Sequence, residues 1–308
     1  MTGQSPARIM KTLVVVTGAT ASGKTSLAID LARRLGCDII SADSRQLYRD
    51  LPIGTAAPTP EERGCVRHHL VGTLPLDAYY SAASFDEDAR RIIESQWQSG
   101  DYALVCGGSM MYVDALLYGL DPLPAVSDTT RVHVTELYRQ HGLAGLQAAL
   151  EIVDPAYYRR VDRNNHKRLI HALEVSYQAG VPYSTLCSGQ RRQWPCRVVK
   201  MAIAMDRPAL FDRINSRVRA MMEQGLLEEA EKVYPRRGLN SLNTVGYKEL
   251  FKYFDGDWDL ETALARMAKN TRVYAKKQLT WLRRDESDLL WLPAEDALDA
   301  ALRSILRG

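Results

Sequence analysis

The chain has 308 residues, of which 46% are hydrophobic and 25% charged, and its formal net charge is +3. This composition allows a sizeable core but excludes a uniformly basic surface, so any nucleic-acid surface must come from local clusters of lysine and arginine. No run reaches the roughly 18 apolar residues of a membrane span, and the five cysteines lack metal-binding spacing. We therefore expect a soluble, cytoplasmic protein without a membrane partner.

Strand and helix patterns alternate along much of the chain. A β-branched run at residues 13–17 predicts a buried strand, and Leu27, Leu31 and Leu35 then follow a helical spacing of four. Because strands that alternate with helices form βαβ units, the sequence predicts an α/β fold with a parallel sheet flanked by helices. The other predicted strands are 37–41, 102–106, 198–205 and 289–292, and a helix is predicted at 110–117.

The alternation stops in the middle of the chain. Loop-forming residues at 121–128 (DPLPAVSD) open this region, and the stretch 187–196 (CSGQRRQWPC) closes it. Between them the pattern predicts only helices. We therefore expect residues 1–120 and 198–308 to form one α/β core, with residues 121–197 as a helical insertion domain. The helices predicted in the insertion and in the last part of the core are 131–140, 143–151, 167–178, 217–233 and 260–284.

The first predicted strand leads into a phosphate-binding loop pattern, Gly18-x-x-x-x-Gly23-Lys24-Thr25. Its glycines let backbone N–H groups converge on phosphate oxygens, and the helix amino terminus adds partial positive charge. Lys24 supplies a full charge and Thr25 a hydroxyl for Mg²⁺. The pattern predicts a P-loop NTPase-like core whose phosphate site comprises Gly18, Ala19, Thr20, Ala21, Ser22, Gly23, Lys24 and Thr25.

The acid that a P-loop hydrolase needs after a second apolar strand is missing. The strand at 102–106 ends in Gly107 and Gly108, and only the strand at 37–41 leads to an acid, Asp43. The sequence therefore indicates that phosphates are held rather than hydrolysed. Asp43 follows a strand end, where ligands bind in α/β sheets, although such residues also often cap turns.

Basic residues gather at several places. Arg213 and Arg217 share one helix face and could grip a diphosphate, or could equally form a solvated face. Residues 266–284 contain seven lysines and arginines and no acid, and further basic clusters lie at 159–168 and 191–197. Three basic segments around one phosphate site favour a nucleic acid as partner.

Seven motifs, in order and spacing, resemble those of the tRNA dimethylallyltransferase family, also called tRNA isopentenyltransferases. The resemblance spans nearly the whole chain, and the segments at 41–58 and 271–284 are its most specific parts. The motifs are GATASGKT (18–25), SADSRQLYRDLPIGTAAP (41–58), HHLV (68–71), GGSMMYVDALLYGL (107–120), KRLIHALEV (167–175), NTVGYKEL (243–250) and TRVYAKKQLTWLRR (271–284).

The resemblance implies transfer of a dimethylallyl group from dimethylallyl diphosphate to N6 of adenine 37 in tRNA. It makes Asp43 the proton acceptor, with Thr20 and Arg217 as the other catalytic residues, Arg213 on the donor and Mg²⁺ as cofactor. We expect a monomer. The residues implied to contact tRNA are Asp43, Ser44, Arg45, Gln46, Ser109, Arg131, Thr271, Arg272, Lys276, Lys277 and Gln278.

Three alternatives remain at this point. A small-molecule kinase would use the phosphate loop and the arginine pair, but it would not need the basic helix at 266–284. An isopentenyltransferase for free adenine nucleotides would share the core without the insertion or the basic helix. A non-enzymatic RNA-binding protein would not need an intact phosphate loop together with Asp43.

Overall fold

The computed structural model describes residues 10–307, apart from the side chains of residues 285–287. Residues 1–9 and 308, at the outer ends of the two predicted core segments, lie outside this range. The described chain divides into two compact units, one formed by its first and last parts and the other by Tyr118–Arg192.

The larger unit is built on one six-stranded sheet with the order β3-β2-β4-β1-β5-β6, and every pair is parallel. This confirms the predicted α/β fold. The short β3 was not predicted, because it has only two residues and neither is fully buried. The strands are β1 (Thr12–Thr17), β2 (Ile39–Ser41), β3 (His68–His69), β4 (Tyr102–Gly107), β5 (Arg197–Ala204) and β6 (Leu289–Pro293).

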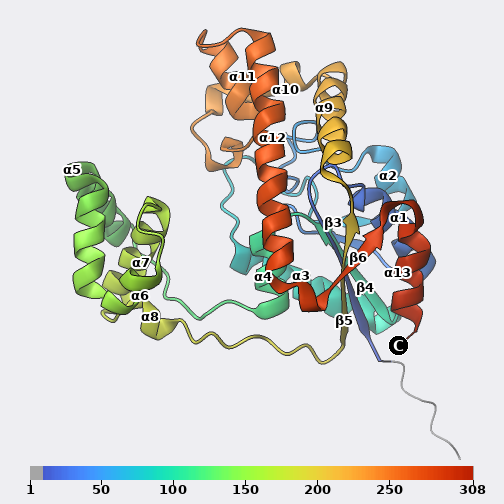
Figure 1. The fold of residues 1–308 in the computed structure, drawn as a ribbon, viewed down its shortest axis with the longest axis horizontal. Helices are drawn as coiled ribbons and strands as arrows, with labels where there is room; N and C mark the ends of the chain where they lie inside the picture. Colours follow the sequence, from blue (N-terminus) through green and yellow to red (C-terminus); the bar gives the residue numbers. More distant parts are fainter. Residues whose placement is uncertain (1–9, 308) are drawn as a thin grey trace, which may run out of the picture. The chain divides into compact units, whose positions relative to one another are not determined.

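Helices cover both faces of the sheet (Figure 1). On one face, α1 and α13 pack on alternate residues of the central strands, such as Val14, Val16 and Leu104. On the other face lie α3 and α4, and the end of α12 packs on β5 and β6. The core helices are α1 (Lys24–Leu35), α2 (Pro60–Cys65), α3 (Ala82–Ser99), α4 (Met110–Tyr118), α9 (Arg207–Glu223), α10 (Leu226–Val233), α11 (Tyr247–Phe254), α12 (Leu260–Leu282) and α13 (Ala297–Leu306).

One predicted helix, 217–233, is divided in the structure. Asp206 caps the start of α9, which ends at Glu223, and Gly225 adopts a left-handed φ of 97° before α10 begins. A glycine in this conformation cannot continue a helix. The break lets α10 turn away from α9 and join a second apolar cluster with α11.

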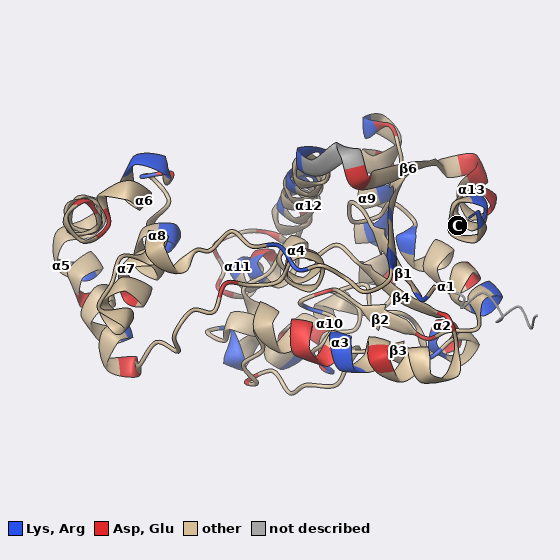
Figure 2. Cartoon of the chain, turned by 90° about the horizontal axis from the view of Figure 1, so that it is seen from below, with Lys and Arg blue, Asp and Glu red and all other residues tan. Residues whose placement is uncertain are grey.

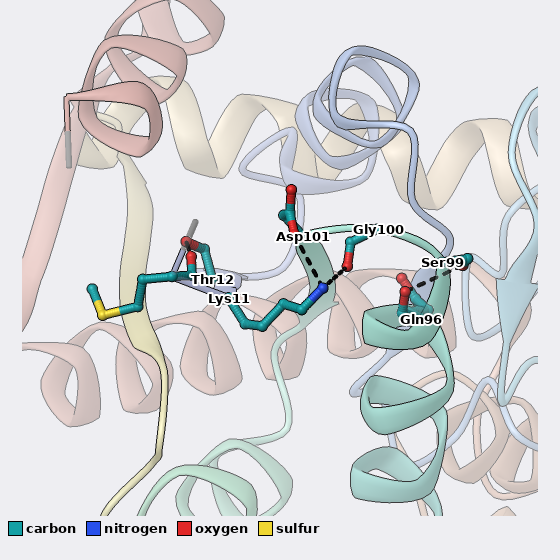
Figure 3. Close-up of polar contacts among 7 residues, drawn as sticks. Lys11, Thr12, Gln96, Ser99, Gly100 and Asp101 are labelled. Carbon is teal, nitrogen blue, oxygen red and sulfur yellow. Dashed lines mark hydrogen bonds and ion pairs between the residues drawn. The ribbon is translucent and has the colours of Figure 1, made fainter. Parts of the chain in front are cut away.

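The amino-terminal ends of β1 and β4 are joined by polar contacts (Figure 3). The Lys11 ammonium donates to the carbonyl of Gly100 at 2.8 Å and to the Asp101 carboxylate at 3.0 Å. The N–H of Thr12 donates to the Asp101 carbonyl at 2.8 Å. These contacts link the amino-terminal ends of the two strands. The phosphate-binding loop lies at the other end of the sheet, where it follows the carboxyl end of β1.

The smaller unit is helical and begins at Tyr118, whose carbonyl accepts a hydrogen bond from the N–H of Arg192. The predicted segment was 121–197, but residues 193–197 lead into β5 and belong to the core. The predicted helices 131–140 and 143–151 are confirmed as two helices that meet at a kink at Gly142, whose φ is 60°, and together they make up α5. The helices of this unit are α5 (Asp128–Val153), α6 (Pro155–Arg160), α7 (His166–Ala179) and α8 (Tyr183–Leu186).

None of the described helices combines the length and the apolar character that crossing a membrane requires.

Candidate active site

The loop after β1 surrounds the amino terminus of α1. Gly18 and Gly23 have φ angles of 152° and 94°, and Ala21 adopts a left-handed φ of 65°. A left-handed alanine costs about 1–2 kcal/mol, so the surrounding structure must hold this loop in place. Because α1 begins at Lys24, its free N–H groups face the loop and create a site for an anion.

A cavity of about 220 Å³ lies against this loop, and we call it the phosphate cavity. Lys24, Arg213 and Arg217 line it, and the Lys24 ammonium donates to the carbonyl of Ala19 at 3.2 Å. Burial lowers the pKa of Lys24 below its ordinary value, and burial, together with the charge of Arg213, lowers the pKa of Arg217. Lys24 and Arg217 are poorly solvated, whereas Arg213 is exposed, and three cations around one cavity favour a ligand with several negative charges.

The structure explains why glycines, instead of an acid, stand at the carboxyl end of β4. A Cβ atom at Gly107 would lie 2.2 Å from the carbonyl oxygen of Ala42, and a Cβ atom at Gly108 would lie 2.4 Å from the amide nitrogen of Gln278. Real Cβ contacts do not come this close. The two positions therefore serve the packing of the loop after β2 and of α12.

A second cavity of about 330 Å³, which we call the acceptor cavity, adjoins the first. Its wall is mostly apolar along α9, with Ile214, Val218 and Met221, and Met267 of α12 continues this surface. Five residues line both cavities: Thr20, Asp43 and Arg217, together with Thr55 and Ala56. The structure thus brings together the three side chains predicted to be catalytic.

Asp43 has two roles in this geometry. Its Oδ1 accepts hydrogen bonds from the backbone N–H groups of Arg45, at 2.9 Å, and Gln46, at 3.3 Å. Asp43 Oδ2 accepts no hydrogen bond from the described residues. The turn-capping interpretation of Asp43 therefore applies to one oxygen, while the other remains available to a ligand between the cavities.

Thr20 lines the same boundary as Asp43. Its hydroxyl oxygen accepts a hydrogen bond from Nη1 of Arg217 at 3.4 Å. Arg217 also receives the favourable charge of Asp43, which raises its pKa against the larger lowering effect of burial. The boundary thus combines a carboxylate, a hydroxyl and a guanidinium.

The other predicted residues of the segment 43–46 shape the cavity walls. The Arg45 guanidinium donates to the carbonyls of Asn240 at 2.8 Å and Ser241 at 3.1 Å. The Gln46 side chain accepts from the Ser41 hydroxyl at 3.0 Å and donates to the carbonyl of Ala56 at 3.0 Å. Ser44 and Arg45 line the acceptor cavity, whereas Gln46 lines the phosphate cavity.

The predicted RNA contacts on α12 divide between its faces. Lys276 and Lys277 are exposed, and Figure 2 shows lysine and arginine along α9 and α12. Arg272 donates to the Asn215 side chain at 2.6 Å, and Thr271 lines the acceptor cavity. Gln278 is only 2% exposed, so its side chain is not on a surface that RNA could reach.

Two further predicted RNA contacts belong to other elements. Ser109 is buried just before α4, and its N–H donates to the carbonyl of Ala42 at 3.1 Å. Arg131 is exposed on α5 of the helical unit, where its Nε donates to the carbonyl of Val126 at 3.5 Å. The structure places Arg131 only within that unit.

Sequence reasoning missed the residues that support the cavity-lining loop at 53–56. The buried Glu229 carboxylate accepts hydrogen bonds from the N–H groups of Ile53 at 2.9 Å and Gly54 at 2.8 Å, and from the Tyr247 hydroxyl at 2.5 Å. A Cβ atom at Gly54 would lie 2.5 Å from the Tyr247 hydroxyl. The available signals were the motifs around Gly54 and Tyr247, but nothing in them pointed to Glu229.

Comparison with known proteins agrees with this geometry. The model of the IPP transferase family matches residues 46–285. The chain belongs to this family. A relative named tRNA dimethylallyltransferase 1 from Phocaeicola vulgatus is 50% identical over 91% of the chain and 93% of its own length. One named tRNA dimethylallyltransferase 2 from Parabacteroides distasonis is 48% identical over 93% and 96%.

Solved structures lead to the same family. The full-length tRNA isopentenylpyrophosphate transferase from Bacillus halodurans is 34% identical, with a TM-score of 0.69 over 96% of this chain and 95% of that one. A eukaryotic dimethylallyltransferase acting on tRNA shares the fold, with a TM-score of 0.81 and 24% identity over 96% of this chain and 78% of that one. The resemblance inferred from the motifs is confirmed.

Proposed function

We propose that this IPP transferase family member transfers a dimethylallyl group from dimethylallyl diphosphate to N6 of adenine 37 in the anticodon loop of tRNA. The observation that carries the proposal is the meeting of Thr20, Asp43 and Arg217 at the boundary of the two cavities. A donor held on one side and a base on the other would react at these three side chains.

The phosphate cavity suits the diphosphate of the donor. The loop N–H groups and the Lys24 ammonium would hold its oxygens, and Arg213 and Arg217 would neutralise the charge that develops as the C1–O bond breaks. The diphosphate then leaves with the bonding electron pair. Water attack on a phosphate is not required, which agrees with the presence of glycines instead of an acid at the carboxyl end of β4.

Thr25 lines the phosphate cavity beside Lys24, so its hydroxyl fits the Mg²⁺ position of a phosphate-binding loop. No cluster of three or more histidine, cysteine or acidic side chains suited to a metal occurs among the described residues. Mg²⁺ would therefore be held by Thr25, phosphate oxygens and water. It would supply charge neutralisation for the leaving diphosphate.

The acceptor cavity suits a base that has left the stack of the anticodon loop. N6 of the adenine attacks C1 of the dimethylallyl group, and a new C–N bond forms as the C1–O bond breaks. The attacking nitrogen becomes acidic as this bond forms, so the free oxygen of Asp43 can take its proton. Hydrogen bonds at Oδ1 hold the carboxylate in place.

The helical unit Tyr118–Arg192 and the exposed lysines of α12 would bind the anticodon stem-loop through its phosphates. A tRNA substrate also supports the predicted cytoplasmic location. Because one chain supplies all the residues of both cavities, we propose that it acts as a monomer.

The test incubates the protein with unmodified tRNA, dimethylallyl diphosphate and Mg²⁺, and then maps the tRNA by mass spectrometry. We expect one isopentenyl group on adenine 37 and release of diphosphate. Parallel reactions contain adenosine monophosphate as acceptor, or ATP in place of the donor. Prenylation of the free nucleotide alone, or phosphoryl transfer from ATP, would replace the proposal with one of the alternatives from the sequence.

A further inference from the structure

A buried amide on α12 joins two parts of the site that are far apart in the chain. Oε1 of Gln278 accepts a hydrogen bond from the N–H of Thr20 at 2.8 Å, and its Nε2 donates to the carbonyl of Gly108 at 2.8 Å. A backbone N–H can only donate and a carbonyl can only accept, so these two partners fix the orientation of the amide.

The chain around this contact leaves no space for another arrangement. Gly108 admits the Gln278 amide only because it has no Cβ atom. One turn earlier on α12, Ala275 belongs to the same buried cluster as Ala19 and Ala21. Ala19, Thr20 and Ala21, three consecutive residues of the phosphate-binding loop, are thus supported by two residues that lie one turn apart on α12.

The loop needs this support because its conformation is not self-sustaining. Ala21 adopts a left-handed φ that L-residues disfavour, and it directly follows the residue that Gln278 binds. The N–H of Thr20 is engaged with Gln278 and is not among the loop donors available for phosphate. The contact instead fixes the peptide from which the Thr20 hydroxyl projects towards Arg217.

We propose that Gln278 is a positioning residue for the transfer reaction: it holds the phosphate-binding loop and sets the Thr20 hydroxyl at the boundary of the two cavities. The inference rests on the proposed function for the reaction itself. It replaces an RNA contact of Gln278 with a role inside the protein. Its substitution should therefore change the donor side and the rate of transfer, while the affinity for tRNA stays the same.

The experiment compares Gln278→Met and Gln278→Glu with the wild-type protein. Methionine keeps the volume but loses both hydrogen bonds, so we expect kcat to fall by about 10- to 100-fold and inorganic diphosphate to bind about tenfold more weakly. The dissociation constant of tRNA should not change. Asn270→Ala is the matched control, since Asn270 is an α12 amide that binds Glu249 and does not line either cavity.

The glutamate variant separates a specific contact from general packing. An ionised carboxylate can accept from Thr20 but cannot donate to Gly108, whereas a protonated carboxyl can do both. The ratio of variant to wild-type kcat should therefore rise as the pH falls from about 8 to about 5.5, because burial favours the protonated form. A structural defect would not follow this profile.

The outcomes separate this inference from the proposed function. Wild-type protein that neither binds diphosphate nor prenylates tRNA would refute the proposed function. If the wild type does both, a Gln278→Met variant with unchanged kcat and diphosphate affinity would refute the positioning role. So would a loss confined to tRNA affinity, or a pH-independent ratio for Gln278→Glu. Thermal unfolding confirms that each variant is folded, and if the methionine variant does not fold, the glutamate profile decides.

Discussion

The phosphate cavity and the acceptor cavity share five lining residues but are built differently. Five of the eight consecutive residues from Gly18 to Thr25 line the phosphate cavity, and we propose that the backbone N–H groups of this loop do much of the binding. The acceptor cavity takes its walls from distant segments, including α9, α12 and the stretch 243–248. A local motif can therefore reveal where phosphates bind, while the acceptor site depends on how the whole core folds.

The largest expected effect separates the two cavities. Lys24→Ala should reduce transfer by about 10³-fold or more, because it removes the charge closest to the phosphate loop. The dissociation constant of tRNA, measured by filter binding, should not change. Lys11→Ala is the control, since Lys11 lies at the amino-terminal end of β1, opposite the phosphate-binding loop, and pairs with Asp101 (Figure 3). Weaker tRNA binding with normal turnover at saturating tRNA would contradict this division.

The pH dependence of diphosphate binding reports on the phosphate cavity alone. Burial lowers the pKa of Lys24 in the free protein, and a bound diphosphate favours its charged form. Below the lowered pKa the lysine is already charged. As the pH rises above it, binding must take up a proton, so affinity should fall by about tenfold per pH unit. Calorimetry should show this alkaline loss in the wild type but not in Lys24→Ala, and identical profiles would rule out Lys24 as its source.

A smaller effect is expected on the acceptor side. Arg45→Ala removes the guanidinium that holds the carbonyls of Asn240 and Ser241. We expect the KM for tRNA to rise about tenfold, because this factor corresponds to the free energy that a hydrogen bond to a charged group contributes. Diphosphate affinity should remain at the wild-type value. A matching loss of diphosphate affinity would mean that the two cavities do not respond independently.

The smallest effect belongs to the exposed face of α12. Lys276→Ala combined with Lys277→Ala should remove two phosphate contacts. The slope of the logarithm of the tRNA binding constant against the logarithm of salt concentration should then fall by about two, with a modest loss of affinity. Titrations at several salt concentrations measure this slope. Lys11→Ala again serves as the control. An unchanged slope would show that these lysines face solvent in the complex.

The sequence predicted what depends on neighbouring residues. The parallel sheet, the phosphate-binding loop and the exposed lysines of α12 follow from local patterns. It did not predict β3, because two half-buried residues form no apolar run. The prediction of a single helix at 217–233 was wrong, because the backbone adopts a left-handed conformation at Gly225.

Long-range partners explain the remaining differences. Gln278 looked like one more polar residue of a basic helix, yet its partner Thr20 lies 258 residues earlier in the chain. Glu229 likewise binds a loop 175 residues earlier at Gly54. A buried polar side chain is recognised only when its partner is known. From the sequence, the glycines at 107 and 108 showed only that an expected acid is missing. The structure shows that a Cβ atom at either position would clash with its neighbours.

Asp43 lies at the boundary of the two cavities, and single-turnover transfer with Asp43→Asn and pre-bound tRNA measures what it contributes to the reaction. The asparagine carbonyl can still cap the turn through Arg45 and Gln46, so the loop and the affinity for tRNA should persist. The amide that then faces the ligand cannot take a proton. We expect a transfer rate lower by about 10²–10⁴-fold with unchanged tRNA binding. A wild-type rate in this variant would show that Asp43 only caps the turn and would refute its role as proton acceptor.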